Sequence, residues 1–376
     1  MPQALPPSLV RRLILINAML SFAMGSLGFS VQLIKRDFEL TRVSAAWHTI
    51  GWAGALIVIS IALLGHGHRR PANQTMRIGW LVVVIGTLAY CFSPSIYFSV
   101  PALALAACGS VIMGNTSAAI LAGHSKTALK NMFSSTGVGL FMGSVSPTVV
   151  GLTTQVDIPW CATVGISVVA IGVIAQFLIP ELGARPEPIA EERRIKWDKR
   201  FIAMMAFGFL AITMEISLST WALDLLTERG AALKTAVLFA TVAPYFVALT
   251  RIYLSTKNEY NLRQIWAISF VAVTIGVGLI IFSTSPLITL AGLIIAAAGI
   301  GPFASIAIAM ASASDQGSDK GIAAFVMGMG ISTGVSPWIM GFISENFGFE
   351  AAYGVILIAL ALATFLFLKI IKKVTI

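Results

Sequence analysis

Glu215 is the residue whose type and position could do chemistry. It lies near the middle of residues 201–225, an apolar stretch long enough to cross a bilayer. An ionised carboxylate at that depth is costly unless it is paired, protonated or facing a polar cavity. Because desolvation disfavours the charged form, we expect Glu215 to bind a proton from one side of the membrane and release it to the other. The structural alternative is a protonated carboxyl bonded permanently to a neighbouring helix.

The helix that carries Glu215 should direct it towards the protein interior. With about 100° between successive helical residues, one stripe of this stretch holds small and polar side chains: Gly208, Ala211, Glu215, Ser219 and Ala222. Arg251 lies near the end of the next expected span, whereas Glu215 lies beyond the midpoint of its own span. We therefore expect these two residues to be too far apart for a fixed salt bridge.

Composition places the chain in a membrane. It has 376 residues, of which 57% are hydrophobic and 11% charged, whereas charged residues make up about 25% of a soluble domain. The net charge is +9, but the basic residues are scattered through short gaps and form no patch for nucleic acid. The three cysteines contain no CxxC pair and indicate no disulfide framework.

Twelve apolar stretches are long enough to be membrane spans. Residues 180–200, between the sixth and seventh stretches, contain eleven charges and three prolines, which excludes this segment from the membrane. The sequence therefore predicts an all-α integral membrane protein with an N-terminal six-helix half at 1–180, a cytoplasmic linker at 181–200 and a C-terminal six-helix half at 201–376. The expected spans are 13–34, 43–64, 78–93, 98–122, 132–153, 160–179, 201–225, 232–254, 264–283, 287–312, 321–344 and 351–371.

The basic residues predict the orientation. If the N-terminus is cytoplasmic, 20 of the 25 Lys and Arg residues fall on the cytoplasmic side and 5 outside. This asymmetry obeys the positive-inside rule and predicts a multi-pass protein of the plasma membrane with both termini in the cytoplasm. Three of the charges expected on that side are Arg69, Arg70 and Arg251.

An internal repeat links the fifth and eleventh spans. A GxxxG pair precedes a VSPxxxG core in each, and the two cores lie 190 residues apart, at 145 and 335. These glycines and prolines either only pack helices or let helices bend and slide where an interface moves. The repeat residues are Gly139, Gly143, Pro147 and Gly151 in the first copy, and Gly330, Gly334, Pro337 and Gly341 in the second.

The whole chain resembles the major facilitator superfamily. Shared features are twelve spans in two halves, a charged central linker, basic loops after the second and eighth spans, and repeats rich in glycine and proline. Glu215-x5-Trp221 followed by Arg251 is similar to the fucose-permease-like branch. The chain departs from the family in that the loop at 65–77 lacks the usual Asp, and the first and fourth spans carry no ionisable residue in their interior.

The resemblance implies a solute cavity lined by the first, fourth, seventh and tenth spans, with the second, fifth, eighth and eleventh at its rim. The candidate lining residues are Asn17, Gln32, His48, Asn115, Ser117, Ser219, Trp221, Tyr245 and Ser305. Several have structural alternatives, because Ser and Thr often bond their own helix, and Asn115 could be a polar contact between helices.

These features predict a secondary active transporter that moves a small solute by alternating access and is coupled to protons. A drug or organic-cation/proton antiporter remains the alternative, and an intramembrane enzyme or a non-transporting sensor is a minor one. His66 and His68 flank Gly67 without a nearby acid or Cys, so no metal site or cofactor is indicated. The expected partners are the solute, the proton and the lipid bilayer, with no nucleic acid, and the expected state is a monomer.

Overall fold

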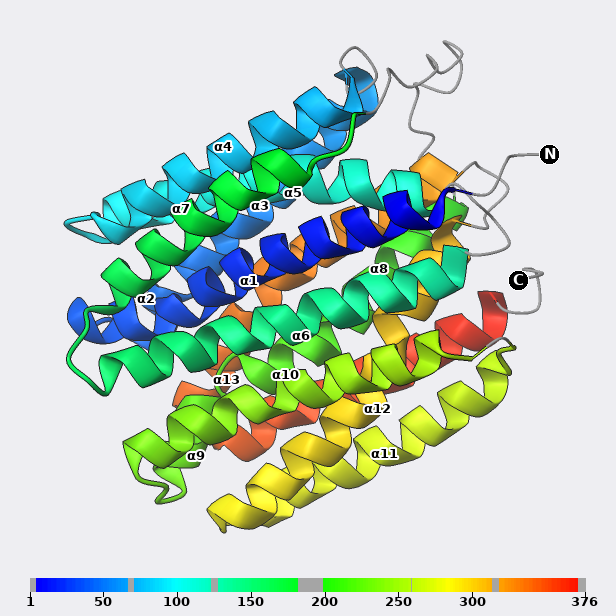
Figure 1. Ribbon diagram of the computed structural model, residues 1–376. Coiled ribbons are helices and arrows are strands. Elements are labelled where there is room, and N and C mark those ends of the chain that lie inside the picture. Colours follow the sequence, from blue (N-terminus) through cyan, green and yellow to red (C-terminus); the bar gives the residue numbers. More distant parts are fainter. Residues whose placement is uncertain are drawn as a thin grey trace.

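The computed structural model describes residues 5–66, 71–122, 128–181, 199–257, 259–312 and 318–370. These residues form a bundle of long helices (Figure 1). The helices are α1 Pro7–Asp37, α2 Arg42–Ala45, α3 Trp47–His66, α4 Ala72–Cys91, α5 Ile96–Ala122, α6 Ala128–Thr154, α7 Trp160–Leu178, α8 Lys199–Ser219, α9 Ala222–Glu228, α10 Leu233–Ser255, α11 Leu262–Phe282, α12 Pro286–Ser312 and α13 Ser318–Ile370.

The bundle is built to lie in a bilayer. Within the described residues, ten helical stretches are long and apolar enough to cross a membrane. Large apolar side chains point outward, such as Phe177 and Phe282, which are 86% and 90% exposed. The prediction of an all-α, multi-pass membrane protein is therefore confirmed. Most of the expected linker, residues 182–198, lies outside the described residues, as do Arg69 and Arg70.

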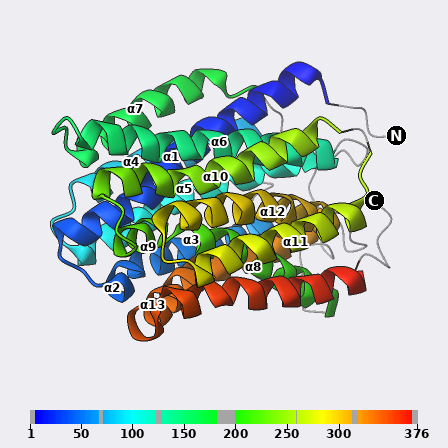
Figure 2. The same ribbon diagram turned by 90° about the horizontal axis from the view of Figure 1, so that it is seen from below.

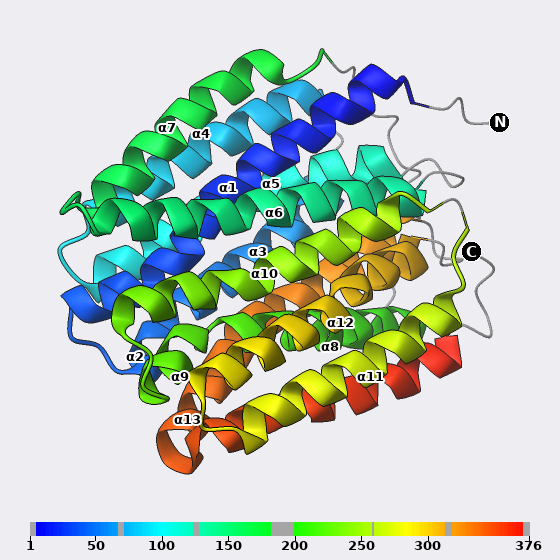
Figure 3. The ribbon, with the colours of Figure 1, turned by 60° about the horizontal axis from the view of Figure 1, so that its bottom comes forward.

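The two ends of the bundle can be distinguished by the chain ends. The start of α1 and the end of α13 lie at the same end of the bundle, which we call the proximal end, in two views that differ by 90° (Figures 1 and 2). The short helices α2 and α9 lie at the opposite end, which we call the distal end. Figure 3 shows α6 lying between α1 and α10, so an N-terminal helix is in direct contact with a C-terminal one.

The last two expected spans are joined without a loop. α13 runs through 53 residues and turns at Gly348, which has φ 84° and ψ 167°. This left-handed φ is easily adopted only by glycine. The expected gap at 345–350 is therefore wrong, because one glycine makes the turn that a loop was expected to make.

The expected seventh span is interrupted after Glu215. α8 ends at Ser219 and α9 begins at Ala222, with Thr220 and Trp221 between them. Side chains from distant helices bond the carbonyl groups at this break. The Tyr353 hydroxyl donates to the Leu218 carbonyl at 3.3 Å, and Gln32 Nε2 donates to the Thr220 carbonyl at 2.8 Å. The prediction of one continuous helix over 201–225 is therefore wrong.

Candidate functional site

Glu215 and Arg251 form an ion pair whose arginine is buried and whose carboxylate is partly exposed, with side chains 5% and 19% exposed. Arg251 Nη2 on α10 donates to Glu215 Oε2 on α8, and Arg251 Nε donates to the Gly301 carbonyl of α12 at 2.8 Å. The Arg251 residue is only 4% exposed. The expectation that the two residues are too far apart is wrong because it compared backbone heights only, whereas arginine carries its charge on a long flexible stem. Arg251 is therefore a buried cation and not a surface charge.

The ion pair lies where N-terminal and C-terminal helices touch. A Cβ placed on Gly137 of α6 would lie 3.1 Å from Arg251 Cβ and 3.0 Å from the Ile252 nitrogen. Beside it, the hydroxyls of Thr136 and Ser305 lie 3.0 Å apart and join α6 to α12. α6 thus contacts α10 and α12, two of the three helices that Arg251 joins.

Tyr245 also joins α6 to α10. Its hydroxyl lies 3.2 Å from Thr148 Oγ1, and its ring meets Phe141 edge-on with centroids 5.3 Å apart. Two predicted cavity residues, Ser305 and Tyr245, are therefore placed at the contact between N-terminal and C-terminal helices.

Asn17 is the centre of a polar contact among three N-terminal helices. Its Nδ2 donates to Ser135 Oγ of α6 at 2.8 Å, and its Oδ1 accepts from Ser117 Oγ of α5 at 2.8 Å. Asn115 lies two residues earlier on α5 and is partly buried. The structure thus brings Asn17 and Ser117 together, in a contact that also holds the helices in place.

Three other predicted cavity residues are bonded within the protein. His48 donates from Nδ1 to the Ala45 carbonyl at 2.9 Å and accepts at Nε2 from Ser99 Oγ at 2.8 Å. A carbonyl can only accept, so the Nδ1 proton is fixed. Trp221 Nε1 donates to the Pro337 carbonyl at 3.0 Å, and Ser219 Oγ donates to the Glu215 carbonyl at 3.2 Å.

His48 and Trp221 differ from Ser219 in being buried, and their part in a solute cavity stays a prediction. His48 is fully buried among N-terminal helices, and Trp221 is 2% exposed at the break between α8 and α9. Their polar atoms are hydrogen-bonded to backbone or hydroxyl groups of the protein. Assigning each residue to a span does not reveal such partners. Neither side chain presents a free polar atom to a solute.

The two GxxxG pairs face different neighbours. A Cβ on Gly143 would lie 3.0 Å from the Ser21 carbonyl oxygen of α1, whereas one on Gly334 would lie 2.6 Å from Ala53 Cβ of α3. The GxxxG pairs are 191 residues apart, one more than the VSPxxxG cores, and one residue turns a helix face by about 100°. Gly139 also contacts α1, as Gly143 does, and Gly330 also contacts α3, as Gly334 does.

The remaining repeat residues mark the same contacts. A Cβ placed on Gly151 would lie 2.9 Å from Val237 Cγ1 of α10, and one placed on Gly341 would lie 3.5 Å from Arg42 Cβ. Pro147 and Pro337 lie inside α6 and α13. The second copy thus faces N-terminal residues, while the first is divided between α1 and α10.

Sequence reasoning missed Asp224, which joins N-terminal and C-terminal helices at the distal end. Its Oδ2 lies 2.7 Å from Lys35 Nζ and 3.1 Å from Arg42 Nε. The sequence did indicate opposite charges at one end of the bundle. Asp224 lies nine residues after Glu215, and the basic residues 35, 36 and 42 were expected at the same end as Asp224. No spacing rule pairs residues from spans so far apart in the sequence.

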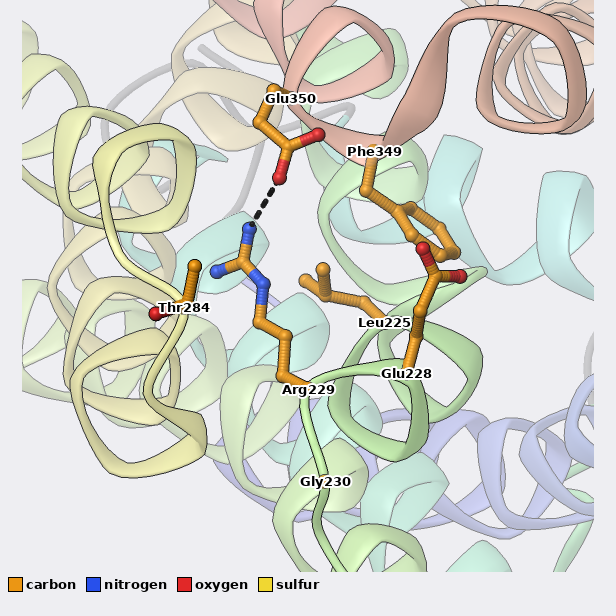
Figure 4. A pocket seen from close by; sticks show the side chains of 7 residues that line it. All are labelled: Leu225, Glu228, Arg229, Gly230, Thr284, Phe349 and Glu350. Atoms are coloured by element: carbon orange, nitrogen blue, oxygen red, sulfur yellow. Dashed lines mark hydrogen bonds and ion pairs between the residues drawn. The ribbon is translucent and has the colours of Figure 1, made fainter.

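A small pocket opens at the distal end of the C-terminal helices (Figure 4). Its volume is about 420 Å³, and it is lined by Leu225, Glu228, Arg229, Gly230, Thr284, Phe349 and Glu350. Arg229 donates to Thr289 Oγ1 at 2.5 Å and pairs with Glu350 at 3.3 Å. None of the predicted cavity residues lines this pocket. Over the described ranges, no three His, Cys, Asp or Glu side chains are grouped to hold a metal ion.

Comparison with known proteins identifies the fold. No protein-family model matches the chain, and no curated protein matches its sequence. Solved structures do match. The E. coli fucose:proton symporter FucP has 11% identity over 96% of this chain and 98% of that chain, with a TM-score of 0.75. The proton:xylose symporter XylE has 10% identity over 96% and 95%, with a TM-score of 0.75. The nucleoside transporter NupG has 12% identity over 96% and 99%, with a TM-score of 0.69.

The chain is therefore a multi-pass helical membrane protein with the major facilitator fold. This confirms the resemblance drawn from its sequence, and a structure of the fucose permease itself is among the matches. At these identities the likeness defines the fold and leaves the solute open.

Proposed function

We propose that this chain is a secondary active transporter that moves a small polar solute by alternating access, driven by protons through Glu215. Matches to solute transporters with the same fold support it. The single observation that carries it is the buried ion pair of Glu215 and Arg251 beneath the contact of α6 with α10. A buried pair of this kind is costly to maintain, and intramembrane charges commonly serve ion pathways.

The proposed topology has twelve spans. To the ten stretches already described it adds α3, which has 20 residues, and it counts α13 as two spans that meet at Gly348. These form two six-helix halves, α1–α7 and α8–α13, on either side of the linker at 181–200. The distribution of Lys and Arg supports a plasma-membrane protein with its proximal end in the cytoplasm.

The chemistry follows from the ion pair. When a proton binds Glu215, the carboxyl becomes neutral and its attraction to Arg251 is lost, while the bond from Arg251 Nε to the Gly301 carbonyl remains possible. Because Gly137 of α6 packs on Arg251 Cβ, this change occurs at the surface where the two halves would move. Parallel repeats that rock about a central site are the expected mechanism of this fold.

A second candidate is exchange of an organic cation for protons. The observation in its favour is that the Glu215 side chain is 19% exposed, whereas its partner Arg251 is 5% exposed. A cationic solute could therefore reach the carboxylate and replace the guanidinium.

Proton-coupled flux in proteoliposomes tests the proposal. Fucose, xylose and a nucleoside are the first probes, because the matched transporters are named for these solutes. A quaternary ammonium dye tests the second candidate. We expect one probe to accumulate against its gradient when a pH gradient is imposed, and Glu215→Gln to abolish accumulation while solute exchange persists. Accumulation by Glu215→Gln with unchanged pH dependence would contradict the role of Glu215. Consumption of a probe without flux would indicate an enzyme.

A further inference from the structure

A group of charged and polar residues joins the two halves at the distal end. Asp224 of α9 holds both Lys35 of α1 and Arg42 of α2, at 2.7 and 3.1 Å. About one turn before Lys35 and Asp224 on their own chain segments, Gln32 of α1 donates to the Thr220 carbonyl at 2.8 Å. We call Gln32, Lys35, Arg42, Thr220 and Asp224 the distal latch.

The break between α8 and α9 makes this contact possible. In an unbroken helix the Thr220 carbonyl would accept from the backbone four residues later. Here α8 has already ended, and the carbonyl accepts from Gln32 of the other half. The short helix α9 then restarts and carries Asp224 in its first turn.

Arg42 is fixed by several groups of the opposite half. Its backbone N–H donates to Glu345 Oε1 at 2.9 Å, its Nη2 lies 3.6 Å from Glu228, and its guanidinium lies 4.8 Å from the centre of the Phe349 ring. Thr41 accepts from the Ser44 N–H at 3.1 Å and so caps α2. The cap orients the first turn of α2, in which Arg42 stands.

The latch is shielded from water. The side chains of Asp224, Lys35 and Arg42 are 12%, 15% and 21% exposed. Such pairs are screened less by salt than fully exposed ones. One acid faces two bases, so removing Asp224 takes from Lys35 the carboxylate it pairs with and leaves Arg42 with Glu228 at 3.6 Å, whereas removing either base leaves Asp224 paired with the other.

We propose that Asp224 is the residue that holds the distal end of the transporter closed, and that its contacts with Lys35 and Arg42 break each time this end opens. This inference rests on the proposed transport function. Asp224 acts by positioning the two halves and does not touch the proton-coupling pair. Neutralising it shifts the protein towards the state that is open at the distal end.

A cysteine reporter measures that shift without requiring transport. Thr49 lies on α3, seven residues after Arg42, and its hydroxyl donates to the Ala46 carbonyl at 2.7 Å; its backbone oxygen would lie 3.5 Å from a Cβ on Gly334 of the other half. Thr49→Cys is made in the full chain with Cys91, Cys108 and Cys161 replaced by alanine. Its rate of reaction with a maleimide is measured in nanodiscs, where both ends are accessible.

We expect Asp224→Asn to raise the labelling rate about tenfold, equivalent to ~1.4 kcal/mol, and Arg42→Gln to raise it less. The double variant should label no faster than Asp224→Asn, because both changes break the same contact. Asp157→Asn, which removes an exposed acid from the same end, is the matched control and should leave the rate unchanged. Size-exclusion profiles confirm that each variant is folded, and if Asp224→Asn fails to fold, Arg42→Gln decides.

Unchanged labelling in the folded latch variants would overturn the proposal, as would an equal rise in Asp157→Asn, which would indicate a general charge effect. Flux of a solute with unchanged labelling would overturn the latch alone. Faster labelling in a protein that transports none of the probes would support the latch and count against the proposed function.

Discussion

Gly25 of α1 lies so close to Gly143 of α6 that a Cβ on Gly25 would be 2.0 Å from the Gly143 carbonyl oxygen. Both α1 and α6 are N-terminal helices, so this contact holds N-terminal helices together. At the 190-residue offset of the VSPxxxG cores, Gly25 and Gly143 correspond to Glu215 and Thr333. The close glycine contact between α8 and α13 is made instead by Gly328, whose Cβ would be 2.0 Å from the Met205 carbonyl oxygen.

Gly25→Leu should therefore lower stability, whereas Gly334→Leu should lower transport more than stability. A Cβ on Gly25 meets the backbone of α6, which is also N-terminal, while one on Gly334 meets the Ala53 side chain across the contact between C-terminal and N-terminal helices, where a bulky side chain obstructs movement. Melting temperature and solute flux, measured on the same preparations, separate the two effects. Gly28→Leu is the control, since nothing lies within 4 Å of a Cβ placed there. Similar losses of stability in both variants would contradict the distinction.

The Glu215 and Arg251 pair should show strong coupling in a double-mutant cycle. Arg251→Gln leaves a partly buried carboxylate, 19% exposed, without its cation and should cost up to about 3–5 kcal/mol. Adding Glu215→Gln removes that unpaired charge, so the double variant should be more stable than Arg251→Gln alone. Thermal melting of the four proteins in detergent measures the coupling. Additive losses would mean that the two side chains act independently.

The spans could be predicted because a bilayer requires about 20 apolar residues in succession, and that requirement is local. The break at Thr220 could not, because residues 215–225 contain neither Gly nor Pro and the bonds that stabilise it come from Gln32 and Tyr353. The partners of Arg251 and Asp224 were hidden for the same reason. Each lies on a helix distant in sequence, and the reach of a long side chain has no signature in spacing.

Trp221→Phe should lower stability modestly without abolishing expression. The aromatic ring is retained, but the bond from Nε1 to the Pro337 carbonyl is lost, which should cost about 0.5–1.5 kcal/mol. Melting temperatures measure this change. Trp338→Phe, at an indole that is 38% exposed, provides the control and should have little effect. If both variants melt alike, the Trp221 bond does not stabilise the break.

Tyr260 should make stability fall at high pH. It lies between α10 and α11, and its hydroxyl donates to the Leu254 and Lys257 carbonyls, both at 3.1 Å. Burial raises the pKa of Tyr260 above the ordinary value of 10.0. The folded protein therefore keeps this proton more tightly than the unfolded chain, so the stabilisation is complete below pH 10 and is lost as pH rises through the folded pKa.

Melting temperatures measured from pH 8 to 11 test this dependence. Tyr260→Phe should melt with a smaller loss over that range than the parent protein. Tyr253→Phe, at an exposed tyrosine of the same region, is the matched variant and should retain the parent's dependence. An identical pH profile for Tyr260→Phe and the parent would contradict the role of Tyr260.

The turn at Gly348 has a consequence for how force passes through the C-terminal half. A single residue reverses the chain, and the residues on both sides are helical. No flexible loop therefore separates the part of α13 before Gly348 from the part after it, which we call its two arms. A displacement of the arm that carries Gly334 and Pro337 must pull on the final arm, where Tyr353 supports the break before α9. The two arms should therefore move together about the turn at Gly348. A displacement of α3 against Gly334 should then also displace α9, the helix that carries Asp224.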